Sequence, residues 1–147
     1  MISVRKMCYG VFFSMMYEKN PLKTVDEKQY QQYLNWVDMI TVIGGVNEEV
    51  IKNLSGVVLV ANMSNGSSDY TDNAIKIANN NISRIIGFVS QKRMPLLTMT
   101  PAINLQKTII KDQNYNMPKD IDTDIYIVGR AIYEADDPES VIKKLFQ

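Results

Sequence analysis

The sequence predicts an α/β fold built around a parallel β-sheet, in a single domain that covers residues 1–147. Short, continuously apolar, β-branched segments alternate along the chain with longer segments of helical periodicity. Most of the apolar segments lack polar alternation, which is typical of strands buried on both faces of a parallel sheet. Six strands are expected, at Gly10–Met16, Met39–Ile43, Val57–Met63, Arg84–Val89, Leu96–Thr100 and Asp124–Val128.

The first expected helix lies between the first two strands. From Val25 to Val37, apolar side chains recur at helical spacing, so that one face carries Tyr30, Tyr33 and Leu34. This segment is predicted to be an amphipathic helix that crosses between parallel strands.

Three later helices are predicted from residues that cap helix ends. Asn47 can cap a short helix that runs through Leu54. Thr71 or Asp69 can cap a helix through Asn79, where the run from Asn79 to Asn81 indicates a helix-ending turn. The final helix is expected to begin at Pro138, after Asp136 or Asp137.

Composition excludes several classes of protein. Sixteen basic residues balance sixteen acidic ones without a basic block, which argues against a nucleic-acid partner. Cys8 is the only cysteine and histidine is absent, so no intrachain disulfide or metal site is expected, and a cytoplasmic location is predicted. No cofactor is expected either. The apolar run from Cys8 to Met16 is much shorter than the roughly 20 residues that span a bilayer, so no membrane segment is expected.

Four segments resemble the orotidine 5'-monophosphate decarboxylase family. Residues 57–64, followed by Asp69-Tyr70-Thr71, resemble its fifth strand and pyrimidine loop, and Ile86-Gly87-Phe88-Val89 is similar to its sixth strand. Residues 97–101 and 124–130 resemble its seventh and eighth strands. The resemblance extends from about Gly10 to the C-terminus.

The resemblance implies a partial or truncated (β/α) TIM-type barrel of about six β/α units, similar to strands 3 to 8 of the family. Family members are usually dimers with sites at the C-terminal ends of the strands. An open remnant would expose two strand edges, which is an aggregation hazard unless they are covered. A homo-oligomer, or a protein partner that covers the open barrel edge, is therefore expected.

The same resemblance assigns candidate site residues. It places Gln113, Tyr115, Gly129 and Arg130 at the substrate phosphate, with the first two in the loop between the last two strands. An arginine fork and backbone N–H groups suit that ligand. Arg130 could instead form a surface salt bridge, and Tyr115 could simply pack the loop.

Two further residues would form a pyrimidine subsite. By the resemblance, Ser64 would hydrogen-bond the pyrimidine ring and Pro101 would shape the loop beside it. The alternative is that Ser64 only caps the end of its strand.

No catalytic residue is assigned, because the family's Asp-x-Lys-x-x-Asp motif is absent. That motif places a lysine between carboxylates to protonate the carbanion. The corresponding positions are occupied by Met15, Tyr17 and Asn20, and the nearest ammonium group belongs to Lys19. Further departures from the family are Ile43 for a histidine, Asn62 for a glutamate, Asp112 for a glycine and a shorter loop over residues 66–69.

Three functions therefore remain open. The first is a catalytically inactive homologue, a pseudoenzyme exapted for a structural or protein-interaction role. The second is a module that binds phosphate or a nucleoside monophosphate such as UMP weakly. The third is an active decarboxylase half, a carbon–carbon lyase of pyrimidine biosynthesis that another chain completes. Turnover of orotidine monophosphate separates the third from the others, and nucleotide binding separates the first two.

Overall fold

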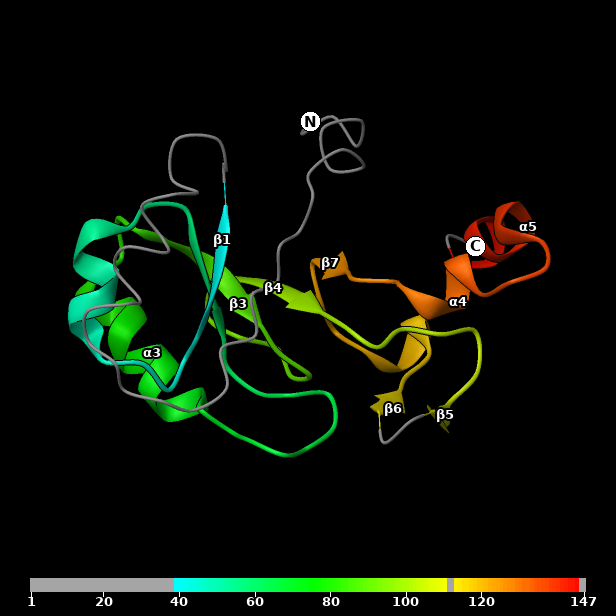
Figure 1. The fold of residues 1–147 in the computed structure, drawn as a ribbon, viewed down its shortest axis with the longest axis horizontal. Helices are drawn as coiled ribbons and strands as arrows, with labels where there is room; N and C mark the ends of the chain where they lie inside the picture. The colour runs from blue at the N-terminus through cyan, green and yellow to red at the C-terminus, as the bar shows by residue number, and fades with distance from the viewer. Residues whose placement is uncertain (1–38, 111–112, 146–147) are drawn as a thin grey trace.

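The computed structural model describes residues 39–110 and 113–145, and the fold is that of these residues (Figure 1). The strand expected at Gly10–Met16 and the helix expected at Val25–Val37 lie outside them. Five described strands lie within the remaining expected ranges. They are β1 (Ile40–Ile43), β2 (Val57–Val60), β3 (Ile85–Val89), β4 (Leu97–Thr100) and β7 (Ile125–Tyr126).

These strands form one parallel sheet in the order β1-β2-β3-β4-β7. Spatial order follows chain order, which is how consecutive strands are arranged in a (β/α) barrel. The predicted α/β class is confirmed, and the sheet is a partial barrel of this type. β3 and β4 approach so closely that a Cβ atom on Gly87 would lie 2.1 Å from the Leu97 carbonyl oxygen. A larger residue at position 87 would therefore separate these two strands.

The capping predictions are confirmed for two of the later helices. The 3₁₀ helix η1 (Glu48–Asn53) begins after Asn47, whose side chain accepts a hydrogen bond from the Glu49 N–H at 3.1 Å. Helix α5 (Pro138–Leu145) follows Asp137, which accepts from the Ser140 N–H at 3.1 Å.

Helix α3 (Thr71–Asn80) also lies where it was expected. Asp69, rather than Thr71, supplies the acceptor at its start, since the Asp69 carboxylate accepts from the Thr71 N–H at 3.0 Å. At its other end the Asn81 side chain donates to the Ile77 carbonyl at 2.9 Å, which agrees with the predicted helix-ending turn.

The sheet buries its two faces unequally. One face packs against η1 and α3 in the larger core cluster, which includes Leu59, Ile77 and Phe88. Among the described residues of the other face, Val58, Val89 and Met99 form a smaller buried cluster. η1 and α3 lie together at one end of the molecule, while α5 lies at the opposite end (Figure 1).

No helix connects β3 to β4, although alternation of strands and helices was expected. Residues 90–96 make this connection without regular structure. Met94 is buried in the larger core cluster. The Met94 N–H donates to the Thr98 hydroxyl at 3.0 Å. A short connection suffices because β3 and β4 pair over only three positions, from Gly87↔Leu97 to Val89↔Met99.

The segment between β4 and β7 contains regular secondary structure. It contains an antiparallel hairpin of β5 (Thr108–Ile110) and β6 (Gln113–Tyr115), followed by the 3₁₀ helix η2 (Pro118–Asp120). Placing Gln113 and Tyr115 in a loop was therefore wrong, because both belong to β6. These strands are only three residues long, too short for an alternating pattern to be recognised in the sequence.

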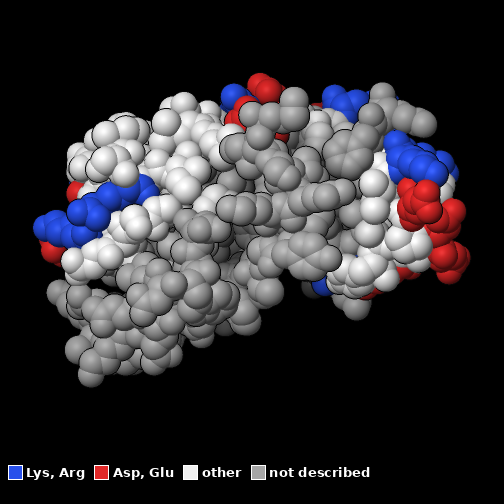
Figure 2. Space-filling view, turned by 90° about the horizontal axis from the view of Figure 1, so that it is seen from above, with Lys and Arg blue, Asp and Glu red and all other residues white. Residues whose placement is uncertain are grey.

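The described surface carries mixed charge. At the α5 end, basic and acidic side chains lie next to each other (Figure 2), as in the Lys143–Glu139 pair at 2.8 Å. Among the described residues, no helix is long and apolar enough to cross a membrane.

Candidate functional site

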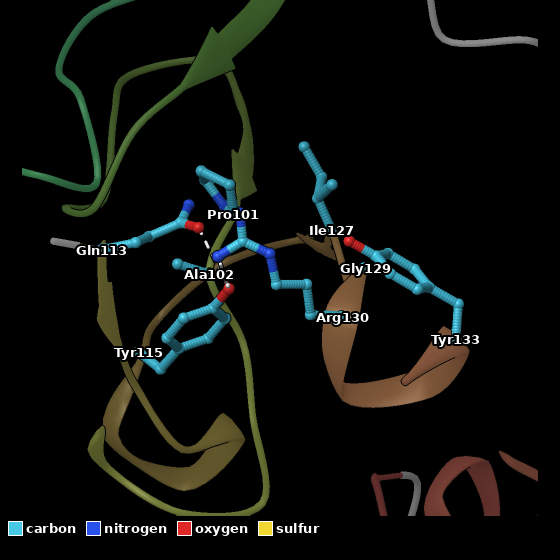
Figure 3. Close-up of a pocket in the computed structure, with 8 residues that line it drawn as sticks. All are labelled: Pro101, Ala102, Gln113, Tyr115, Ile127, Gly129, Arg130 and Tyr133. Atoms are coloured by element: carbon cyan, nitrogen blue, oxygen red, sulfur yellow. Dashed lines mark hydrogen bonds between the residues drawn. The ribbon is translucent and has the colours of Figure 1, made fainter. Parts of the chain in front are cut away.

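A pocket of about 250 Å³ lies where the end of β4, the hairpin and helix α4 (Arg130–Tyr133) meet (Figure 3). The lining residues come from three separated stretches of the chain and are Pro101, Ala102, Gln113, Tyr115, Ile127, Gly129, Arg130 and Tyr133.

A chain of hydrogen bonds connects four of the predicted site residues. An Arg130 guanidinium nitrogen (Nη1) donates to the Tyr115 hydroxyl at 3.4 Å, and this hydroxyl donates to Gln113 Oε1 at 3.0 Å. Gln113 Nε2 in turn donates to the Ser64 hydroxyl at 2.8 Å. This series of hydrogen bonds therefore joins residues 66 positions apart, from the loop after β2 to the start of α4.

The hairpin is held against the end of β4 by backbone pairing. The Asn116 N–H donates to the Ala102 carbonyl at 2.9 Å, and the Asn104 N–H donates to the Asn116 carbonyl at 2.9 Å. Tyr115 is only 4% exposed, so its ring is packed while its hydroxyl reaches the pocket. Tyr115 thus has both of the roles considered for it, as a packing residue and as a pocket residue.

The pocket contains a positively charged group. The Arg130 side chain is 28% exposed, and the nearest carboxylate among the described residues, that of Glu134, lies 4.0 Å away. The Tyr133 hydroxyl, and after it Tyr115, raises the pKa of the Arg130 guanidinium. Arg130 is consequently cationic at any pH at which the protein is folded, and its contact with Glu134 is too long to neutralise it strongly.

Asn62 lies outside this pocket, in a separate polar cluster at the ends of β2 and β3. Its amide nitrogen donates to the Ser90 hydroxyl at 3.0 Å, and its oxygen accepts from the Gln91 N–H at 2.7 Å. The side chain is 9% exposed and hydrogen-bonded through both amide atoms. The Asn62 amide therefore holds the loop after β3 by hydrogen bonds, and unlike a carboxylate it does not ionise.

The structure brings five of the six predicted site residues to the pocket and connects the sixth to it by a hydrogen bond. Gln113, Tyr115, Gly129 and Arg130 all line the pocket, as does Pro101. Ser64 does not line it, but it is connected to it through Gln113. The positions discussed for catalysis, which are Met15, Tyr17, Lys19 and Asn20, lie outside the described residues, as does Asp112.

Three lining residues were not predicted. Ala102 follows the Thr100-Pro101 pair and has a φ of 59°, a left-handed conformation that cannot be read from an alanine in sequence. Tyr133 lies three positions after Arg130, a spacing that places both residues on one side of a helix. That spacing could have indicated Tyr133 once α4 was known to begin at Arg130. No comparable signal singles out Ile127.

Known proteins resemble this chain over most of its length. Residues 23–145 match the model of the orotidine 5'-phosphate decarboxylase / HUMPS family. A uridine 5'-monophosphate synthase of Caenorhabditis elegans is 33% identical over 145 positions, covering 80% of this chain and 29% of that protein. An orotidine 5'-phosphate decarboxylase of Schizophyllum commune is 33% identical over 104 positions, covering 55% of this chain and 37% of that protein.

A uridine 5'-monophosphate synthase of Bos taurus is 28% identical over 131 positions, which cover 72% of this chain and 27% of that protein. The chain therefore spans between 27% and 37% of the length of these relatives. The family match, the order of the parallel strands and the convergence of the expected residues agree with one another. The chain belongs to the orotidine 5'-phosphate decarboxylase / HUMPS family.

Proposed function

We propose that this chain is a non-catalytic member of the family that binds the phosphate of a nucleoside monophosphate in the pocket around Arg130. The observation that carries this proposal is the convergence of Gln113, Tyr115, Gly129 and Arg130, from two separate stretches of the chain, on one pocket. The two stretches are separated by 14 positions in the sequence, from Tyr115 to Gly129, yet all four residues line one cavity.

The chemistry of the pocket suits a phosphate group. A guanidinium presents several N–H donors in a fixed plane, which matches the oxygens of a phosphate. The Arg130 side chain is 28% exposed, so the charge is partly shielded from water yet accessible to a ligand. Gly129 lines the pocket and directly precedes α4.

Binding is expected to be weak. Glu134 lies 4.0 Å from the Arg130 Nε atom and is 52% exposed, so its carboxylate competes with a bound anion. Tyr115 already donates its hydroxyl hydrogen to Gln113, so it does not offer that hydrogen to a ligand in this arrangement.

Calorimetric titration with UMP tests the proposal. Arg130→Ala should cost about 1.5–3 kcal/mol of binding free energy, the usual contribution of a hydrogen bond to a charged group. Arg130→Lys should fall between this variant and the wild type, because it retains the charge but loses the planar fork. Lys143→Ala, which removes a cation that is 67% exposed on α5, serves as the control and should bind as the wild type does. UMP binding that survives Arg130→Ala would show that the phosphate lies elsewhere.

The absence of decarboxylation is part of the same proposal. The family's lysine–carboxylate array would require acidic and lysine side chains where the sequence has Met15, Tyr17 and Asn20. The purified chain should therefore leave the absorbance of orotidine 5'-monophosphate unchanged. Substrate-dependent turnover that Lys19→Ala abolishes would instead favour an active decarboxylase half.

A protein-interaction role is the second candidate, and the sheet edges favour it. Within the described part of the chain, β1 pairs only with β2, and β7 pairs only with β4. Unpaired strand edges are ready to pair with another chain. Light scattering at low micromolar concentration should therefore detect a dimer, a larger oligomer or self-association. A stable species with the mass of one chain would remove the support for this role.

A further inference from the structure

Tyr133 is the large pocket residue whose role is not explained by packing. Its side chain lines the pocket, yet the residue is 68% exposed. An exposed aromatic residue that had no function would be free to lie along the surface. The Tyr133 side chain instead lies beside the pocket with its hydroxyl directed towards Arg130 and Ile127 (Figure 3).

The Arg130 guanidinium lies between two phenols. Figure 3 shows the Tyr115 and Tyr133 rings on opposite sides of the Arg130 side chain. Tyr133 has the largest effect among the groups that raise the pKa of Arg130, and Tyr115 comes second. The Tyr115 hydroxyl accepts from the Arg130 guanidinium at 3.4 Å, and the Tyr133 hydroxyl is directed towards Arg130 (Figure 3). A hydroxyl whose oxygen is close to a cation is polarised and becomes a stronger donor through its hydrogen.

The Tyr115 and Tyr133 hydroxyl groups differ in whether their hydrogen already has an acceptor. The Tyr115 hydroxyl donates to Gln113 Oε1 at 3.0 Å, so its hydrogen is occupied. Within residues 39–110 and 113–145, the structure records no acceptor for the Tyr133 hydrogen. A phenol has one hydrogen to donate, and Tyr133 is the tyrosine of this pocket that retains it.

We infer that Tyr133 is a further ligand-binding residue, whose hydroxyl donates to a phosphate oxygen while Arg130 binds the same group. The inference rests on the proposed phosphate site and extends it to a preference for phosphomonoesters over phosphodiesters. A phosphomonoester presents three terminal oxygens and a charge near −2, whereas a diester presents two terminal oxygens and a charge of −1. A second donor beside the guanidinium therefore favours the monoester.

The test compares two tyrosines that each lose only a hydroxyl. Tyr133→Phe should raise the Kd for UMP about tenfold, as expected for a hydrogen bond to a charged group. Tyr126→Phe is the matched control, because the Tyr126 hydroxyl is bonded to the Pro118 carbonyl at 3.1 Å and does not line the pocket. Its Kd should equal that of the wild type. Since Tyr133 is exposed, neither substitution should alter the fold, and circular dichroism would verify this.

The methyl ester of the UMP phosphate is the second probe. The wild type should bind UMP more tightly than this diester, and Tyr133→Phe should reduce that difference. If the wild type binds UMP and Tyr133→Phe binds it equally well, the inference about Tyr133 is wrong while the phosphate site stands. If the wild type does not bind UMP at millimolar concentration, both the phosphate site and this inference are wrong.

Discussion

Two regions of this molecule use their side chains in different ways. The sheet region, consisting of β1, β2 and β3 with η1 and α3, buries most of its apolar side chains, and Val57, Val58 and Leu59 on β2 are fully enclosed. The pocket region, consisting of the hairpin, β7, α4 and α5, is half-exposed. No residue of α4 is buried, and Leu145 is the buried residue of α5.

The difference indicates how stability and binding are divided. Burial of apolar surface is the main favourable contribution to folding, so the sheet region should determine whether the chain folds. Binding elements are commonly taken from the less stable parts of a protein, where side chains can meet a ligand. The pocket region should therefore tolerate substitutions that the sheet region does not.

The largest effect is expected from a matched pair of isoleucines. Ile77 on α3 is 1% exposed, and Ile142 on α5 is 40% exposed. Ile77→Ala should reduce the free energy of unfolding by about 2–5 kcal/mol, because it leaves a cavity in the core. Ile142→Ala should reduce it by less than about 1 kcal/mol. Urea denaturation followed by circular dichroism measures both, and equal losses would contradict the division between the regions.

A smaller change in stability, in this case a gain, is expected from a substitution in the pocket wall. Ala102 has a φ of 59°, a conformation that costs a residue with a Cβ atom roughly 1–2 kcal/mol. Ala102→Gly removes that strain but adds freedom to the unfolded chain, so the net gain in stability should be roughly 0.5–1 kcal/mol. Ala131→Gly, within α4, is the control and should instead destabilise. A loss of stability in Ala102→Gly would show that the alanine methyl group packs favourably.

The smallest predicted effect is a loss of stability at low pH, and each of the two regions contains a carboxylate that should contribute to it. The Thr98 N–H, and secondly Arg93, lowers the pKa of Asp124 from its ordinary value of 3.8. In the sheet region, Asn80 and Asn81 lower the pKa of Glu48. A lowered folded-state pKa contributes stability above the ordinary value, and that stability is lost as the pH falls through the lowered value.

Thermal melts between pH 2 and pH 6 would measure this loss. The melting temperature should fall below about pH 4, and Asp124→Asn or Glu48→Gln should each flatten the decline. The effect is modest because Asp124 is exposed and Glu48 is only partly buried. An unchanged pH profile in Asp124→Asn would mean that the contact with the Thr98 N–H adds no stability.

The sequence predicted the sheet region better than the pocket region, for a physical reason. Strand and cap signals are local, so β2 and the caps at Asn47 and Asp137 could be recognised from neighbouring residues. The pocket depends on contacts between distant segments, such as the bond between Gln113 and Ser64. Family resemblance indicated those residues, whereas periodicity could not.

The parts that were missed lack a local signal. The hairpin has strands of three residues, with polar Gln113 and Asn114 in one of them. Residues 90–96 connect parallel strands without a helix, which composition does not reveal. Tyr133 and Ala102 became recognisable as pocket residues only when the path of the chain was known.

The central claim is that ligand binding belongs to the pocket region and stability to the sheet region. An NMR titration with UMP, which follows the backbone amide signals, tests it most directly. The signals of Ala102, Tyr115 and Arg130 should shift in a saturable manner, while those of Ile51 in η1 and Ile77 in α3 should not move. Shifts centred on η1 and α3, or no shifts at millimolar UMP, would contradict it.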